Sequence, residues 1–89
     1  MFVKMKKLDP NIYGLKPRIK IFENSKKKLF IVIDRKSRII MKDGFKIFEI
    51  AQKVRQKEEQ KKIGLLTSAP VCSKTKSFLS INNILVESL

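Results

Sequence analysis

Residues 29–44 read LFIVIDRKSRIIMKDG, and this stretch decides the fold class. It holds the apolar runs LFIVI and IIM, which are joined by a charged segment from Asp34 to Arg38. Each run is too short for a helix and is rich in β-branched side chains, so we predict two adjacent strands. LFIVI does not alternate apolar with polar residues, so both faces of its strand should be buried in the middle of a sheet.

The flanking segments supply the other elements of an α/β (α+β-like) fold. Alternation of isoleucine with basic residues before the LFIVI run indicates a half-exposed strand, and helical spacing of apolar residues after Gly44 indicates a helix. We predict a small mixed sheet of about five strands and the order β-β-β-α-β-α-β. The expected elements are strands at Arg18–Glu23, Leu29–Ile33 and Arg38–Lys42, a helix capped by Asp43, a strand at Ile63–Thr67 parallel to Arg38–Lys42, a helix over Ser73–Asn82, and a strand at Ile84–Val86.

The chain is expected to form one domain preceded by an arm. Its 89 residues suffice for a single core, so residues 18–89 should fold as one small α/β domain. Residues 1–17 mix apolar side chains with lysines and carry turn residues, which is typical of an extended basic arm with room for a short opening strand.

The predicted central strand needs cover on both faces. If the last strands add to the sheet in one direction, right-handed crossovers place both helices on one face of the sheet. The other face then needs cover from the arm at Phe2–Leu15, from a second copy of the chain or from a partner protein. Asn82 and Asn83, after the second helix, can adopt the left-handed conformation that ends helices.

The composition is strongly basic. There are 21 Lys and Arg residues against 8 Asp and Glu, which gives a formal net charge of +13 at pH 7. A field of this sign attracts phosphate backbones or acidic protein surfaces. We therefore expect nucleic acid as the partner, RNA rather than DNA, with an acidic protein surface as the alternative; a larger complex or a homo-oligomer stays open.

The cysteine content and the apolar runs indicate the compartment. A single cysteine cannot form an internal disulfide, and the start MFVKMKK lacks the apolar core of about 7–15 residues of a secretory signal. No apolar run reaches the roughly 18 residues that a membrane-spanning helix needs. We expect a reducing compartment, the cytoplasm or an organelle stroma, without membrane insertion.

The candidate nucleic-acid contacts are basic side chains in a turn, a charged loop and one helix face. Lysine and arginine in such places contact phosphates and carry little information about bases, although a solvated surface is the alternative for each group. Of the aromatic residues, only Tyr13, Phe22 and Phe2 are expected to be free for stacking on bases. The candidates are Lys26, Lys27, Lys28, Arg35, Lys36, Ser37, Arg38, Lys46, Lys53 and Lys57.

The loop TSAPVCSKT, residues 67–75, is a second candidate site. It should follow a parallel strand and open a helix, where free backbone N–H groups and the helix dipole bind anions. Plain helix capping is the alternative. The helix start should also favour the thiolate of Cys72, although no histidine is available as a base. The candidate anion ligands are Ser68, Ser73, Lys74 and Thr75.

Asp34 and Lys42 suggest a third chemistry. A carboxylate and a lysine on neighbouring strands of a meander followed by α and β elements resemble the core of the restriction-endonuclease superfamily. Those enzymes hold metal with a second carboxylate two residues before the lysine, and Ile40 occupies that position here. We therefore expect no metal, no cofactor and no catalytic residue, and assign Asp34 as an ion-pair partner of Arg35, Arg38 or a lysine.

These observations favour a non-catalytic, basic nucleic-acid-binding module that contacts the phosphate backbone, as an RNA-associated protein or a subunit of a ribonucleoprotein or transcription assembly. The alternative function is a small adaptor of a large intracellular complex that docks on acidic neighbours.

Overall fold

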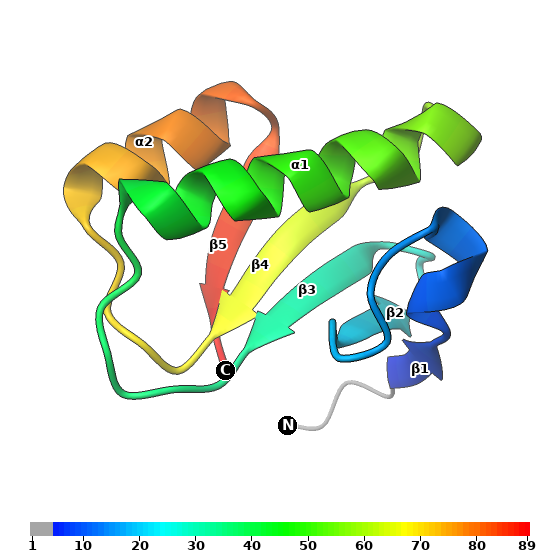
Figure 1. Cartoon of the computed structure of the whole chain (residues 1–89), viewed down its shortest axis with the longest axis horizontal. Helices are drawn as coiled ribbons and strands as arrows, with labels where there is room; N and C mark the ends of the chain where they lie inside the picture. Colours follow the sequence, from blue (N-terminus) through cyan, green and yellow to red (C-terminus); the bar gives the residue numbers. More distant parts are fainter. Residues whose placement is uncertain (1–4) are drawn as a thin grey trace.

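The computed structural model describes residues 5–89 (Figure 1). The order of the main elements is the predicted β-β-β-α-β-α-β, with one short 3₁₀-helix added after the first strand. The elements are β1 (Met5–Leu8), η1 (Pro10–Tyr13), β2 (Ile21–Asn24), β3 (Leu29–Ile33), α1 (Met41–Lys57), β4 (Ile63–Thr67), α2 (Ser73–Ile81) and β5 (Ile84–Ser88).

The five strands form one mixed sheet in the order β1-β2-β3-β4-β5. β1, β2 and β3 are antiparallel neighbours, whereas β3, β4 and β5 are parallel. The LFIVI run is therefore the central strand, as predicted. Ile31 pairs with Ile21 on one side and with Leu65 on the other, and all three side chains are buried.

The strand predicted at Arg38–Lys42 is wrong. Ile39 makes only an isolated parallel bridge with Val71, and α1 begins at Met41. The third strand of the meander is β1, inside the N-terminal arm, and β4 runs parallel to β3 instead. The run IIM was ambiguous because a short apolar segment fits either a strand or the first turn of a helix. The structure buries Ile39 and leaves Ile40 exposed.

Both helices cover the same face of the sheet, as right-handed crossovers require (Figure 1). α1 buries Ile47, Ala51 and Val54, a stripe at helical spacing, against the strands. Tyr13 and Leu15 from the arm join the same core.

No helix in residues 5–89 is long and apolar enough to cross a membrane.

A glycine permits the close approach of α1 and α2. A Cβ atom added at Gly44 would lie 3.0 Å from Cγ2 of Thr75, which is tighter than ordinary van der Waals contact. The short helix α2 ends at Ile81 with Asn82 as its C-cap, and Asn83 adopts the left-handed conformation with φ 60°, as predicted for this pair. The start of β5 is thereby fixed directly after the helix.

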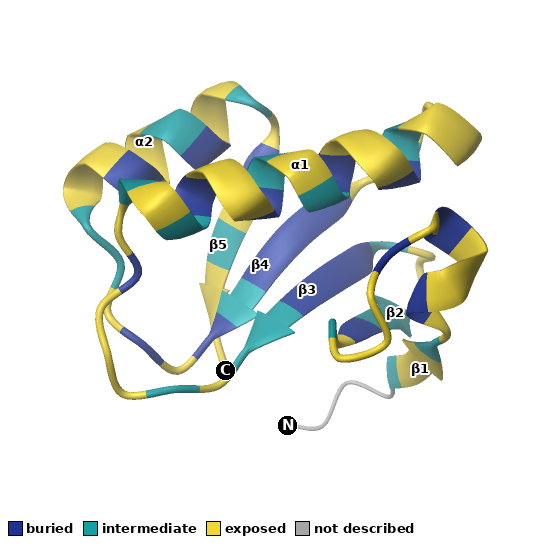
Figure 2. Ribbon diagram, in the orientation of Figure 1, coloured by how far each residue is buried: buried dark blue, intermediate teal, exposed yellow. Residues whose placement is uncertain are grey.

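The second face of the sheet is closed in part by its own side chains. Phe30 is only 4% exposed because its ring lies over Gly64, and the Lys28 ammonium lies 5.0 Å from the centre of that ring. Leu85 at the β5 edge remains 56% exposed. Figure 2 shows that buried positions concentrate in β3 and β4. The arm at Phe2–Leu15 was one predicted cover for this face. Its residues Tyr13 and Leu15 pack instead into the core on the helix side, and its start at Phe2 lies outside the described residues.

The central position of β3 yields a stability prediction. Ile31 is 2% exposed, so Ile31→Ala should lower the free energy of unfolding by roughly 2–5 kcal/mol through lost burial and a cavity. Urea unfolding measures this difference. The matched control is Ile81→Ala, at a side chain that is 80% exposed, and it should change stability by less than about 0.5 kcal/mol. Similar losses in both variants would contradict the central position of β3.

Candidate nucleic-acid interface

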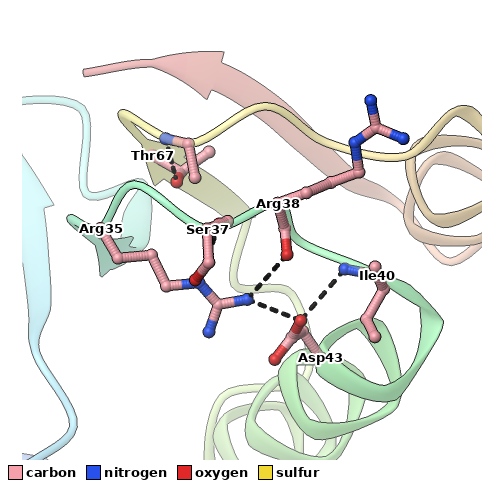
Figure 3. Close-up of polar contacts among 7 residues, drawn as sticks. Arg35, Ser37, Arg38, Ile40, Asp43 and Thr67 are labelled. Carbon is pink, nitrogen blue, oxygen red and sulfur yellow. Dashed lines mark hydrogen bonds and ion pairs between the residues drawn. The ribbon is translucent and has the colours of Figure 1, made fainter.

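Arg35 organises the loop that leads from β3 into α1 (Figure 3). Its Nε donates to the Ser37 carbonyl at 3.2 Å, and its Nη2 donates to the Arg38 carbonyl at 3.2 Å and to Oδ2 of Asp43 at 2.6 Å. The same carboxylate oxygen accepts the backbone N–H of Ile40 at 3.0 Å. Arg35 thus shapes its own loop, and its Nε and Nη2 groups are occupied by these hydrogen bonds.

Asp43 caps the start of α1 from inside the helix. The sequence placed it immediately before the helix; the structure places it in the first turn, where its carboxylate still accepts a free backbone N–H and faces the positive helix end. The Arg35 guanidinium holds the pKa of Asp43 below its usual value, and burial opposes this shift. The ion pair therefore ties the charged loop to the helix.

The predicted basic residues fall into separate groups. Lys26–Lys28 form the turn before β3, whereas Arg35–Arg38 follow β3, so the strand separates the two groups. The Asn24 side chain accepts from the backbone N–H of Lys26 and of Lys28 and shapes the turn. Lys28 forms an ion pair with Glu87 at 3.0 Å. Lys26, Lys27, Lys36 and Arg38 remain exposed to solvent, and Ser37 is exposed beside them.

Lys46 and Lys53 belong to a third group, together with two cations that the sequence did not single out. The segment at residues 15–19 crosses beside α1 and leaves a cavity of about 500 Å³ between them. Lys16 and Arg18 stand on the segment side of this cavity, opposite Lys46 and Lys53 on the helix. We call this feature the basic groove, and its lining is Leu15, Lys16, Arg18, Ile19, Lys46, Glu49, Ile50 and Lys53.

The cations of the basic groove lack carboxylate partners among residues 5–89. The ion pairs of this part of the chain use Lys28, Arg35 and Lys61, and none of the four groove cations takes part in one. Glu49 is the one acidic residue in the lining. Lys57 follows Lys53 by four positions, so it lies on the same side of α1, beyond the groove. Alternation of basic and apolar residues before β2 was the signal that could have drawn attention to Arg18.

The loop at residues 67–75 holds its hydroxyl groups in different surroundings. The Ser68 hydroxyl donates to Oδ1 of Asp34 at 2.5 Å, and Thr75 is fully buried beside Gly44. Ser73 and Lys74 are exposed at the start of α2. The backbone N–H groups of Lys74 and Thr75 lower the pKa of the Cys72 thiol, in the direction that the sequence predicts. The hydroxyls of Ser68 and Thr75 therefore do not converge with Lys74 on one point.

The structure corrects the roles of Asp34 and Lys42. Asp34 accepts a hydrogen bond from Ser68, while the predicted partner Arg35 pairs with Asp43. Lys42 lies in α1 and not on a strand beside Asp34. Within residues 5–89, no group of three or more His, Cys, Asp or Glu side chains is placed to hold a metal ion.

Comparison with known proteins places the fold but not a family. No family model matches the chain, and no curated protein matches it. Two solved structures of EndoMS share the fold over 96% of this chain: the apo form at TM-score 0.68 and 12% identity, and a complex with double-stranded DNA at TM-score 0.72 and 11% identity. The chain spans 36% of the length of each EndoMS chain. At these identities the likeness shows a common fold.

The ion pair between Arg35 and Asp43 yields a prediction about pH. Asp43→Ala should lower the free energy of unfolding at pH 7 by about 0.5–2 kcal/mol, because α1 loses a cap and a charge at its positive end. A lowered folded-state pKa means that this contribution is present above the ordinary value of 3.8 and is lost as the pH falls through the folded-state pKa. Urea unfolding at pH 7 and at low pH measures both.

The matched control for this prediction is Glu49→Ala, which removes an exposed carboxylate from the middle of the same helix. It should have little effect on stability at either pH. A loss in Asp43→Ala that is equally large at both pH values would show that the charge of Asp43 contributes nothing.

Proposed function

We propose that this chain is a non-catalytic nucleic-acid-binding module whose basic groove contacts the phosphate backbone. The observation that carries the proposal is the convergence of Lys16, Arg18, Lys46 and Lys53 on one groove without carboxylate partners among residues 5–89. Binding of a polyanion to cations so placed is favourable because the polyanion releases its condensed counterions. The net charge of +13 adds a long-range attraction that speeds encounter.

The chemistry of the groove favours phosphates over bases. Three of its four cations are lysines, which act as point charges on flexible stems. Its apolar side chains, Leu15, Ile19 and Ile50, are aliphatic and offer no ring for stacking. Contacts of this kind position a nucleic acid without reading its sequence. Binding should therefore depend strongly on salt and weakly on sequence.

The likeness of fold to EndoMS supports a nucleic-acid partner, because one of the two EndoMS structures is a complex with double-stranded DNA. The sequence prediction is RNA rather than DNA, as part of a ribonucleoprotein or transcription assembly. Backbone contacts by themselves suit both polymers, so duplex DNA and RNA are the two probes of choice. RNA remains the proposed physiological partner.

The test is a salt titration of binding to labelled, mixed-sequence RNA and duplex DNA. The wild-type affinity should fall steeply between about 50 and 200 mM salt as counterion release weakens. The double variant Lys46→Ala/Lys53→Ala should bind more weakly at low salt. Its plot of log affinity against log salt should be less steep by about one unit for each lysine. Fluorescence anisotropy measures both quantities.

The matched control is Lys7→Ala/Lys76→Ala, which removes the same charge from exposed positions on β1 and α2. It should keep the wild-type salt slope. An equal loss in both double variants would mean that net charge acts without the groove. Failure of the wild type to bind either polymer at low salt would reject the proposed function.

A further inference from the structure

An exposed apolar surface lies on the outer side of the helix layer. Phe45 of α1 is 53% exposed and Ile81 of α2 is 80% exposed, although both are large apolar side chains. Phe78 joins them, with its ring edge-to-face against Phe45 at 5.2 Å and against Phe48 at 5.8 Å. We call Phe45, Phe48, Phe78 and Ile81 the aromatic ridge. Phe48 and Phe78 are half-buried, and Phe78 also packs against the core.

The aromatic ridge has the form of a binding surface. Phe45 and Phe48 are three positions apart on α1, and Phe78 and Ile81 are three positions apart on α2, so each pair lies on one helix face. A hollow of about 420 Å³ beside Phe78 and Ile81 is lined further by Ser73, Lys74 and Ser77. Contiguous exposed apolar side chains on small proteins mark interaction sites.

The charges around the aromatic ridge define the partner. Lys74 lines the hollow, Lys42 lies three positions before Phe45 on the same side of α1, and α2 contains no acidic residue. An apolar surface with a cationic rim is complementary to an apolar surface with an acidic rim. A second copy of this chain would bring another net charge of +13 against the same rim, which opposes self-association.

We propose that the aromatic ridge docks an acidic amphipathic helix of a partner protein. An amphipathic helix can pack apolar residues at i, i+3, i+4 and i+7 against exposed apolar side chains of this spacing, and one of its side chains can enter the hollow beside Phe78 and Ile81. Ile81 is aliphatic and has no ring for a base, so a protein side chain suits this end of the ridge. The ridge uses the side of α1 that contacts α2, whereas the basic groove uses the side next to residues 15–19, so the two sites are independent.

The test is selection from a random peptide display library on the full chain. Selected peptides should be enriched in Asp and Glu and should carry apolar residues at helical spacing. Synthetic copies should bind the double variant Phe45→Ser/Ile81→Ser at least about tenfold more weakly than the wild type. The matched control is Ile12→Ser/Leu85→Ser, which removes exposed apolar side chains from η1 and β5, and it should keep the wild-type affinity.

Other results would overturn this proposal. Selected peptides without acidic enrichment, or peptides that bind both double variants equally, would show that the ridge does not recognise an acidic helix. Self-association of the wild type that Phe45→Ser/Ile81→Ser abolishes, measured by sedimentation equilibrium, would assign the ridge to a second copy. Loss of single-stranded RNA binding in that variant, with peptide binding unchanged, would assign it to base stacking. None of these results depends on the basic groove, which the salt titration tests separately.

Discussion

The pairing of β3 with a strand on each side is the constraint on which the rest of the structure depends. Ile31 lies between Ile21 and Leu65, and its buried backbone groups form their hydrogen bonds in the ladder of the sheet instead of with water. A strand that is apolar on both faces needs a helix layer, and two right-handed crossovers bring α1 and α2 to the same face. The second face is left to side chains, such as the Phe30 ring over Gly64. Charged residues are therefore absent from β3 and β4.

The scarcity of carboxylates decides which cations remain available. Among residues 5–89, the ion pairs occupy Glu23, Asp43, Glu58 and Glu87, and each of them connects elements or shapes a turn. Tyr13 also donates to Glu58, and burial together with this carboxylate raises the pKa of Tyr13. With 21 basic residues and 8 acidic ones, most cations cannot be paired within the chain. Those that gather in one place without a partner, as in the basic groove, have the strongest attraction for an external anion.

The helix α1 separates two surfaces of different chemistry. One side, next to residues 15–19, is cationic with an aliphatic floor, and the other side, next to α2, is aromatic with a cationic rim. Only a narrow stripe of α1 is needed to cover the sheet, so packing in the core does not constrain the side chains on the two flanks of the helix. The proposed nucleic acid and the proposed acidic helix therefore occupy different flanks, and this arrangement suits a small protein that joins a polyanion to a larger assembly.

Local patterns in the sequence determined the element order, the central place of β3 and the left-handed Asn83, because periodicity and turn chemistry act over a few residues. The common face of both helices follows from right-handed crossovers only when the strand order is known. Only the tertiary structure decided which segment completes the meander. An apolar run such as IIM is compatible with both a strand and a helix start, and only its contacts with other elements distinguish the two. It also decided the role of Arg35. This residue belongs to a charged run that is typical of a solvated turn, yet its side chain forms an ion pair with Asp43 eight positions later. The meeting of Lys16 and Arg18 with the lysines of α1 likewise depends on how the arm packs against the helix, a long-range contact that no local spacing encodes.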